Sequence, residues 1–241
     1  MRSAWRAADE LGVDTIFTWD HFYPLYGEPD GPHFECLTTM ASMAEVTERA
    51  RIGALVCCNS YRNPELLADA HRTIDHISGG RTILGIGAGW FQRDYDEYGY
   101  EFGDAPYRLR ELRAALPRIK ARLGKLNPPA VGSMPILIGG SGEKVTLRLV
   151  AEHADMWHAF GDAEAFAQKD AILREHCAAV GRDPAEIERT WAIPPTSIED
   201  ADSLVAAGVQ HLIVGIGGNG GDYDLGPLRE LVAWRDGAGG S

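Results

Sequence analysis

An acidic residue and a histidine stand next to each other at Asp20 and His21, in the stretch TWDHFYP. A carboxylate beside an imidazole can fix the tautomer of the ring, which then donates or accepts a proton near neutral pH. The pair follows an apolar run at residues 15–19, so we expect it where a strand ends. Taken alone, the two residues are explained slightly better by a turn carboxylate and a packed core histidine. Their place at a strand end favours catalysis.

The stretch PILIGGSGEK, residues 135–144, runs from an apolar segment through glycines into a helical pattern. Backbone N–H groups and the helix dipole favour negative charge at such a junction, so we predict an anion site there. The GxSxG nucleophile elbow is excluded, because its last position, counted from Gly139, is Glu143. We predict instead that Ser141 is an N-cap or a phosphate ligand ahead of a helix over residues 142–152.

Glycines also end two other apolar runs, ILGIGAG at 83–89 and LIVGIGGNGG at 212–221. Glycine lets a ligand come close to the backbone, although a tight turn explains any single case equally well. The stretch GIGAGW, Gly85 to Trp90, fails the GxGxxG dinucleotide fingerprint because its third glycine comes one residue early. GxGxG after a strand is also found in methyltransferases that use S-adenosylmethionine, which is a weak signal.

The segment at residues 91–107, FQRDYDEYGYEFGDAPY, is long, acidic and aromatic, and it follows a predicted strand. Long loops in that position are often substrate lids, and a solvated surface loop is an equal alternative. Several aromatic residues of this part of the chain indicate either an apolar pocket or a core or lid role: Trp19, Phe22, Tyr23, Tyr95, Tyr98 and Phe102.

Short apolar runs alternate with amphipathic stretches along the whole chain. Most of the runs do not alternate apolar with polar residues, which is typical of strands buried on both faces of a parallel sheet. They predict seven strands, at residues 15–19, 51–58, 81–87, 135–139, 154–158, 189–193 and 211–216. Helices are predicted between the strands, for example from Asn63 as N-cap to a stop at Gly79.

Seven strands that alternate with helices predict an α/β protein, a (β/α)8 TIM barrel that lacks its first strand. We expect the missing strand before Met1, because a helical pattern starts there at once and such helices follow a strand in this fold. The main alternative is an open doubly wound sheet. No linker interrupts residues 1–241, so we expect a single domain.

Composition limits the partners. The formal net charge of −12 argues against nucleic acid but not against a small anionic ligand. No apolar run approaches the ~20 residues that span a bilayer, and the start of the chain lacks a signal-peptide core. We therefore expect a cytoplasmic protein that takes a small-molecule substrate and binds no membrane. The cysteines have no metal-ligand spacing, so we predict no metal and expect buried thiols at Cys36, Cys57, Cys58 and Cys177.

On these residues the chain resembles the luciferase-like monooxygenase superfamily, and more closely its branch of oxidoreductases that use the deazaflavin coenzyme F420. The resemblance rests on WDHF at 19–22, RNPELLA at 62–68, TIDHISGGRTILGIGAGW at 73–90 and PILIGGSGEKVTLRLVAEHADMWH at 135–158. It covers nearly the whole chain and implies one TIM-barrel domain of the bacterial-luciferase-like type.

The resemblance also implies roles for single residues. Asp20 and His21 match the acid–histidine pair beside the cofactor ring, where His21 would act as acid/base or electrostatic partner to hydride transfer. The family's phosphate loop, which would hold the phosphate of F420 or FMN, is matched by Gly139, Gly140, Ser141 and Gly142.

Two further segments are implied to lie near the cofactor ring. Leu55, Val56 and Cys57 match a strand segment that often carries a non-proline cis peptide bond and backs the ring. We place that bond at Leu55–Val56. Gly87 and Trp90 match the strand end near the cofactor.

Four functions follow from these patterns. The first is an oxidoreductase that transfers a hydride between F420 and a small organic substrate, and the second is an FMN-dependent monooxygenase that uses O2. The WDHF stretch favours the first, since a histidine there serves hydride chemistry. A non-catalytic cofactor-binding protein is supported only by the missing strand. A methyltransferase leaves WDHF and GGSGEK unexplained. The unpaired strand edges make a homodimer the expected oligomer.

Overall fold

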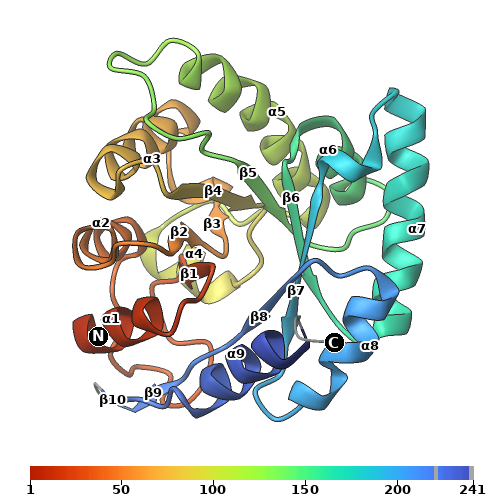
Figure 1. The fold of residues 1–241 in the computed structure, drawn as a ribbon. Helices are drawn as coiled ribbons and strands as arrows, with labels where there is room; N and C mark the ends of the chain where they lie inside the picture. Colours follow the sequence, from red (N-terminus) through yellow and green to blue (C-terminus); the bar gives the residue numbers. More distant parts are fainter. Residues whose placement is uncertain (220–221, 239–241) are drawn as a thin grey trace. The chain divides into compact units, whose positions relative to one another are not determined.

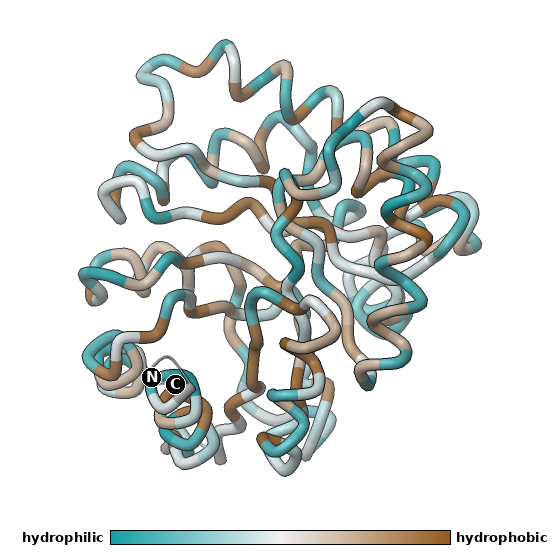
Figure 2. The backbone as a smooth tube through the Cα atoms, turned by 45° about the vertical axis from the view of Figure 1, so that its right-hand side comes forward, coloured by the Kyte–Doolittle hydropathy of each residue, from teal (hydrophilic) through white to brown (hydrophobic). Residues whose placement is uncertain are grey.

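The computed structural model describes residues 1–219 and 222–238, and it divides the chain into two compact units. Unit 2 comprises Thr15–Gly139, and unit 1 comprises Met1–Asp14 with Gly140–Ser241. The glycines at 220 and 221, which end the third glycine-rich run, lie outside the described residues. Along the helical coils the hydropathy alternates between hydrophilic and hydrophobic, which is typical of helices that bury one face (Figure 2).

Unit 2 is built on parallel strands in the order β1-β2-β4-β5, and the short strand β3 also pairs with β4. Its strands are β1 (Thr15–Thr18), β2 (Arg51–Ala54), β3 (Cys57–Cys58), β4 (Thr82–Gly87) and β5 (Ile136–Gly139). Its helices are α2 (Cys36–Val46), a 3-10 turn η1 (Asn59–Tyr61), α3 (Pro64–Ser78), α4 (Gln92–Tyr98) and α5 (Ala105–Leu123). In Figure 1, α2 lies beside β1 and β2, α3 lies beside β4 and α2, and α5 lies beside α3.

Unit 1 contains a second set of parallel strands, in the order β6-β7-β8. These are β6 (Met156–Phe160), β7 (Glu188–Ile193) and β8 (His211–Val214), and a small antiparallel pair follows at β9 (Gly218–Asn219) and β10 (Asp222–Tyr223). The helical segments are α1 (Arg2–Glu10), α6 (Thr146–His153), α7 (Ala163–Val180), η2 (Pro184–Glu186), η3 (Ile198–Asp200), α8 (Ala201–Ala207) and α9 (Gly226–Ala238). Successive helices α6, α7 and α8 pack against one another (Figure 1).

All seven predicted strands form, and one of them is divided. The run at 51–58 becomes β2 and β3, which are separated by a cis peptide bond between Leu55 and Val56. The prediction of that bond is confirmed. The caps of α3 are confirmed as well: the Asn63 side chain accepts from the N–H of Leu66, and Gly79 ends the helix in the left-handed conformation.

Two helix predictions need correction. The helix predicted over 142–152 begins at Thr146, so Ser141 is not its N-cap; that position is Val145, which makes no side-chain cap. The reason is a wider turn before the helix, in which the N–H of Leu147 bonds to the carbonyl of Gly142. The segment at 91–107 is not one loop. It contains α4 and the first turn of α5, which is capped by the Asp104 side chain.

The core of unit 1 contains large aromatic rings on the helix-facing side of its strands. Trp157 and Phe166 both pack edge-on against Trp191, with ring centroids 5.5 Å and 5.1 Å from it, and all three side chains are fully buried. Because side chains alternate along a strand, the neighbours His158 and Thr190 face the other side of the sheet. Within the described residues no helix is both long and apolar enough to cross a membrane.

His158 is a buried histidine that stays neutral. Its Nδ1 lies 2.9 Å from the Thr190 hydroxyl oxygen, which itself donates to the carbonyl of Trp157. The hydroxyl must therefore accept the proton of Nδ1. Burial and then the charge of His211 lower the pKa of His158 to about 3.

This histidine predicts a loss of stability in acid. Because the pKa is lower in the folded chain than in the unfolded one, the unfolded chain binds the proton first, and stability falls as the pH drops below the ordinary value of 6.5. The expected contribution is about 1.4 kcal/mol per pH unit, or about 2 kcal/mol between pH 6.5 and about pH 5. Urea unfolding at several pH values measures it. The His158→Asn variant, which keeps a donor but cannot titrate, should lose correspondingly less; an equal loss would contradict the assignment.

Candidate functional site

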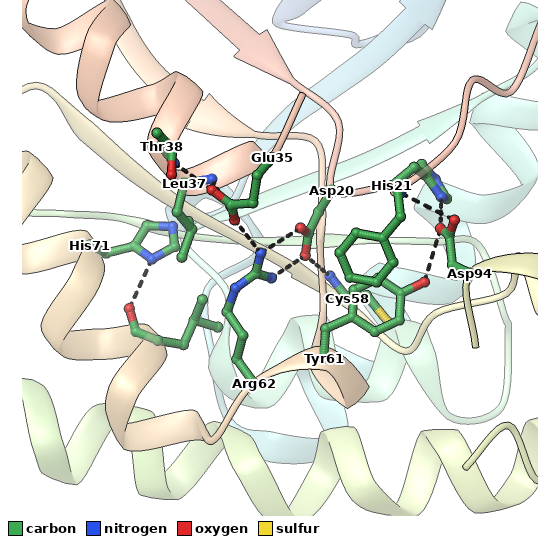
Figure 3. A network of polar contacts seen from close by, with 12 residues as sticks. Asp20, His21, Glu35, Leu37, Thr38, Cys58, Tyr61, Arg62, His71 and Asp94 are labelled. Atoms are coloured by element: carbon green, nitrogen blue, oxygen red, sulfur yellow. Dashed lines mark hydrogen bonds and ion pairs between the residues drawn. The ribbon is translucent and has the colours of Figure 1, made fainter. Parts of the chain in front are cut away.

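His21 forms its close contact with a carboxylate from a distant part of the chain. Its Nδ1 lies 2.7 Å from Oδ2 of Asp94, which is 73 residues away on α4 and is fully buried (Figure 3). Oδ1 of Asp94 accepts the backbone N–H of Phe22 at 3.1 Å, and the hydroxyl of Tyr61 donates to Oδ2 at 3.1 Å. The Asp94 carboxylate thus faces three donors.

This arrangement fixes which nitrogen of His21 can react. An ionised carboxylate only accepts hydrogen bonds, so Nδ1 carries the proton that Asp94 accepts. Nε2 is then the nitrogen left for proton exchange with a bound molecule. Burial raises the pKa of Tyr61, helped by the charges of Cys58 and Asp94, so that its hydroxyl stays protonated and remains a donor.

Asp20 has a different partner from the one that the sequence suggested. Its two oxygens bind the Arg62 guanidinium at 2.6 Å and 2.8 Å, and Oδ2 also accepts the N–H of Cys58 at 2.9 Å. Arg62 reaches Glu35 as well, at 2.7 Å (Figure 3). The predicted pairing of Asp20 with His21 is therefore corrected to a pairing of His21 with Asp94. Successive residues at a strand end point in different directions, which separates the two neighbours.

The Asp20–Arg62 pair ties the end of β1 to the segment after the cis peptide bond. Burial opposes the charge of Arg62, but the hydrogen bonds and charge of Asp20 outweigh it and raise the pKa of Arg62, which stays charged. Because Cys58 follows Val56 by two residues, the carboxylate of Asp20 holds the main chain at that point. We infer a positioning role for Asp20.

Most of the aromatic residues near His21 form a small core of their own. Phe22 stacks on Tyr98, with ring centroids 4.0 Å apart, and packs against Tyr61 at 4.7 Å. Tyr95 is fully buried and packs edge-on against Phe102, while Cys58 and Tyr61 belong to the same cluster. The core interpretation of Phe22, Tyr95 and Phe102 is thus favoured over the pocket interpretation, whereas Tyr98 is exposed and stacks on Phe22 from outside the core. Tyr23 is covered by the Arg93 guanidinium, 3.8 Å from the ring centre.

Two aromatic residues instead border the exposed side of His21. Trp90 lies edge-on to the His21 ring with centroids 5.9 Å apart, and Phe91 does so at 5.4 Å. Trp90 is 64% exposed, whereas the side chain of His21 is 14% exposed. Trp90 thus has an exposed aromatic surface next to His21.

Val56 explains several of the glycines at the strand ends. A Cβ at Gly87 would lie 2.8 Å from a methyl group of Val56, and a Cβ at Gly139 would lie 3.0 Å from another. The side chain of Val56, half-buried after the cis bond, therefore rests on glycines of β4 and β5. Leu55 is also half-buried, whereas Cys57 has a fully buried side chain, so only its main chain can line a site.

The predicted phosphate loop begins at the last residue of β5 and continues in unit 1. Gly140 has a φ of +128°, a conformation that glycine adopts without strain, and its N–H bonds to the carbonyl of His158. Ser141, Gly142 and Lys144 are exposed ahead of α6. A hydroxyl, backbone N–H groups and an ammonium group near a helix N-terminus are the donors that a phosphate requires. Among the described residues, no group of three or more acidic, histidine or cysteine side chains could hold a metal ion.

Sequence reasoning missed Asp94, Tyr61 and Arg62 as site residues. Asp94 stood in a segment noted for its acidity, and Arg62 stood in the stretch RNPELLA, but no local spacing connects either of them to TWDHFYP. The signal that could have found them is their position after the strands of one sheet. Tyr61 and Arg62 follow β3, and Asp94 follows β4.

We expect Asp94→Asn to lower turnover by about tenfold to a hundredfold. An asparagine offers one acceptor oxygen to three donors, and its NH2 group would favour the wrong tautomer of His21. The ¹⁵N chemical shifts of the His21 ring should show the proton moving from Nδ1 to Nε2. The exposed neighbour Asp96 provides the control, since Asp96→Asn should leave the shifts in place. Loss of activity with an unchanged tautomer would contradict the role given to Asp94.

Comparison with known proteins places this geometry in context. A family model described as luciferase-like monooxygenase matches residues 1–226. An F420-dependent glucose-6-phosphate dehydrogenase of Amycolatopsis mediterranei is 35% identical over 115 residues, which are 47% of this chain and 34% of that protein. The chain thus spans about a third of the length of this curated relative.

Two solved structures have the same fold. An F420-dependent secondary alcohol dehydrogenase, in complex with an F420–acetone adduct, superposes with a TM-score of 0.82 at 16% identity, over 95% of this chain and 92% of that one. The oxygenating constituent of 3,6-diketocamphane monooxygenase of Pseudomonas putida, in complex with FMN, gives 0.63 at 15% identity, over 79% and 60%. The fold is therefore the α/β TIM-barrel type of luciferase-like proteins, with seven of its eight strands among the described residues, and the doubly wound alternative is set aside.

Proposed function

The chain belongs to the luciferase-like monooxygenase family, and from this premise we propose that it is an F420-dependent oxidoreductase that moves a hydride between the deazaflavin and a small organic substrate. The observation that carries the proposal is His21, whose Nδ1 is engaged by Asp94 and whose Nε2 is left for proton exchange. Support also comes from the relatives named for F420.

The chain's own residues fit such a cofactor. The half-buried Leu55 and Val56 offer an apolar backing for a flat ring, and Trp90 offers an exposed aromatic surface. The donors of the loop 139–142, with Lys144 beside them, suit a phosphate. We assign the ring to Leu55, Val56, the main chain of Cys57, Gly87 and Trp90, and the phosphate to the loop.

F420, when bound, supplies the hydride acceptor or donor, and the protein supplies orientation and a proton partner. Nε2 of His21 takes the proton from a substrate hydroxyl as the hydride leaves its carbon, or returns it to a carbonyl oxygen in the reverse direction. Asp94 stabilises the imidazolium through Nδ1, and Tyr61 holds Asp94. Asp20 and Arg62 keep the segment behind the ring in place.

Turnover assays without oxygen and with oxygen test the proposal. Purified protein is mixed with F420 and a panel of alcohols without oxygen, and reduction of F420 is followed by its absorbance. We expect F420 reduction that does not require oxygen. Oxygen consumption with reduced FMN, and no reduction of F420, would assign the protein to the FMN-dependent monooxygenases instead.

A further inference from the structure

Two segments that carry the candidate catalytic pair account for most of the net negative charge of the protein. Residues 19–35 carry His21, residues 90–104 carry Asp94, and together they contain nine carboxylates and a single basic residue, Arg93. These 32 residues thus account for a formal charge of −8 out of the −12 of the whole chain. The field beside His21 therefore repels anions.

Two neighbouring arginines outside the segments, Arg62 and Arg108, reduce the formal charge of the region from −8 to −6. Together with Arg93 they are engaged by acceptors of unit 2, so that none of the three is presented to an anionic ligand. Arg62 donates to Asp20 and Glu35. Arg93 pairs with Asp30, donates to the carbonyl of Pro29 at 2.7 Å and lies over the Tyr23 ring. The third arginine is Arg108, on α5.

Arg108 is buried and donates its hydrogen bonds to main-chain carbonyls rather than to a carboxylate. Its guanidinium donates to the carbonyls of Gly89, Phe102 and Gly103, at 3.0 Å, 3.0 Å and 3.1 Å. It also lies 4.0 Å from the centre of the Phe102 ring. This arginine therefore braces the loop that follows β4, and it is not presented to a substrate.

The surface that remains beside His21 is aromatic. Trp90 and Phe91 meet the histidine ring edge-on, and Trp90 is largely exposed. Such rings bind apolar faces of a ligand and do not compensate a negative charge. The aromatic contacts favour a ligand with an apolar face, and the negative field disfavours a ligand with a negative charge. Both therefore favour an uncharged, partly apolar molecule.

We propose that the His21 site takes an uncharged alcohol or carbonyl compound with an apolar face, and that it discriminates against phosphorylated or carboxylated substrates. The inference rests on the proposed function and specifies its substrate class. The site selects chiefly by repulsion: an anion meets the net negative charge of the two segments, which the neighbouring arginines reduce but do not cancel, whereas a neutral molecule is not repelled.

Two matched probes test this without requiring turnover. Benzyl alcohol is neutral and 4-(hydroxymethyl)benzoate is its anionic counterpart, and binding of each is followed by the ring proton signals of His21 in NMR, assigned with His21→Gln. We expect benzyl alcohol to bind at least about tenfold more tightly at low salt. The difference should shrink as ionic strength rises, because salt screens the carboxylates.

A charge-neutralised variant provides the matched control. Asp96 and Glu97 are exposed on α4, close in sequence to Asp94, and neither forms a hydrogen bond with His21 or Asp94, although the charge of Glu97 acts on Arg93. Asp96→Asn with Glu97→Gln should strengthen binding of the anionic probe several-fold and leave benzyl alcohol unchanged. Equal or tighter binding of the anionic probe to the parent protein, or no response of His21 to benzyl alcohol, would overturn the inference.

The same titrations are run with the chain alone and with F420 added. If F420 fails to bind, the proposed function fails, and the titrations of the chain alone still decide the charge preference. If F420 binds and the anionic probe is preferred, the substrate inference fails and the proposed function stands. The two results are thus distinguishable.

Discussion

Replacing His21 with alanine is expected to lower turnover by about a thousandfold and to change the affinity for F420 by less than about threefold. The imidazole is the proton partner of the substrate, and its Nδ1 is held by Asp94 at 2.7 Å. The cofactor, in contrast, is assigned mainly to main-chain groups and apolar side chains away from the imidazole, and Trp90, which meets the imidazole edge-on, keeps its exposed face. The two measurements are turnover with F420 and a fluorescence titration of F420.

The control for this variant is a histidine on the surface of the same unit. His76, on α3, is exposed and contacts the carbonyl of Pro129, so His76→Ala should retain full turnover. Undiminished turnover of His21→Ala would remove His21 from the chemistry. A loss of F420 binding equal to the loss of turnover would move His21 into the cofactor site.

The second large effect is expected from Gly85→Ala, which should lower the free energy of unfolding by about 3 kcal/mol or more. A Cβ at Gly85 would lie 1.9 Å from the carbonyl oxygen of Ala54 and 3.5 Å from a methyl group of Val56. The first of these atoms belongs to the backbone of the neighbouring strand and cannot move aside as a side chain does. The strands must therefore separate where the cis segment begins.

Urea unfolding measures the effect, and Gly124→Ala is its matched control. Gly124 ends α5 with a φ of −69°, and the nearest atoms to an added Cβ lie at 3.8 Å. That substitution should change stability by less than about 1 kcal/mol, in the stabilising direction, because alanine restricts the unfolded chain. Equal destabilisation by the two variants would show that the contact at Gly85 does not control the packing.

The strands could be predicted from the sequence because a strand buried on both faces must be apolar along its whole length. The runs ILGIG and PILIG are apolar throughout and form the buried strands β4 and β5. The chain turns at Gly79 and Gly181, where helices end in the left-handed conformation. Helix starts were less predictable. The turn before α6 depends on a hydrogen bond between Leu147 and Gly142 that no residue type announces.

The partner of His21 could not be predicted either, because it depends on a contact between residues that are far apart in the sequence. Asp20 is adjacent in sequence, but the strand end directs its carboxylate to Arg62, and only folding brings Asp94 to the histidine. The cis bond at Leu55–Val56 was predicted from family resemblance and not from the residues themselves. Its glycine neighbours, Gly87 and Gly139, were noted for ligand approach, and the structure adds their contact with Val56.

A binding titration of the purified chain with F420 and, separately, with FMN tests the central claim most directly. Fluorescence reports both, and the measurement requires no knowledge of the substrate. The proposed function predicts saturable binding of F420, at least about tenfold tighter than that of FMN. Tighter binding of FMN, or binding of neither, would contradict it.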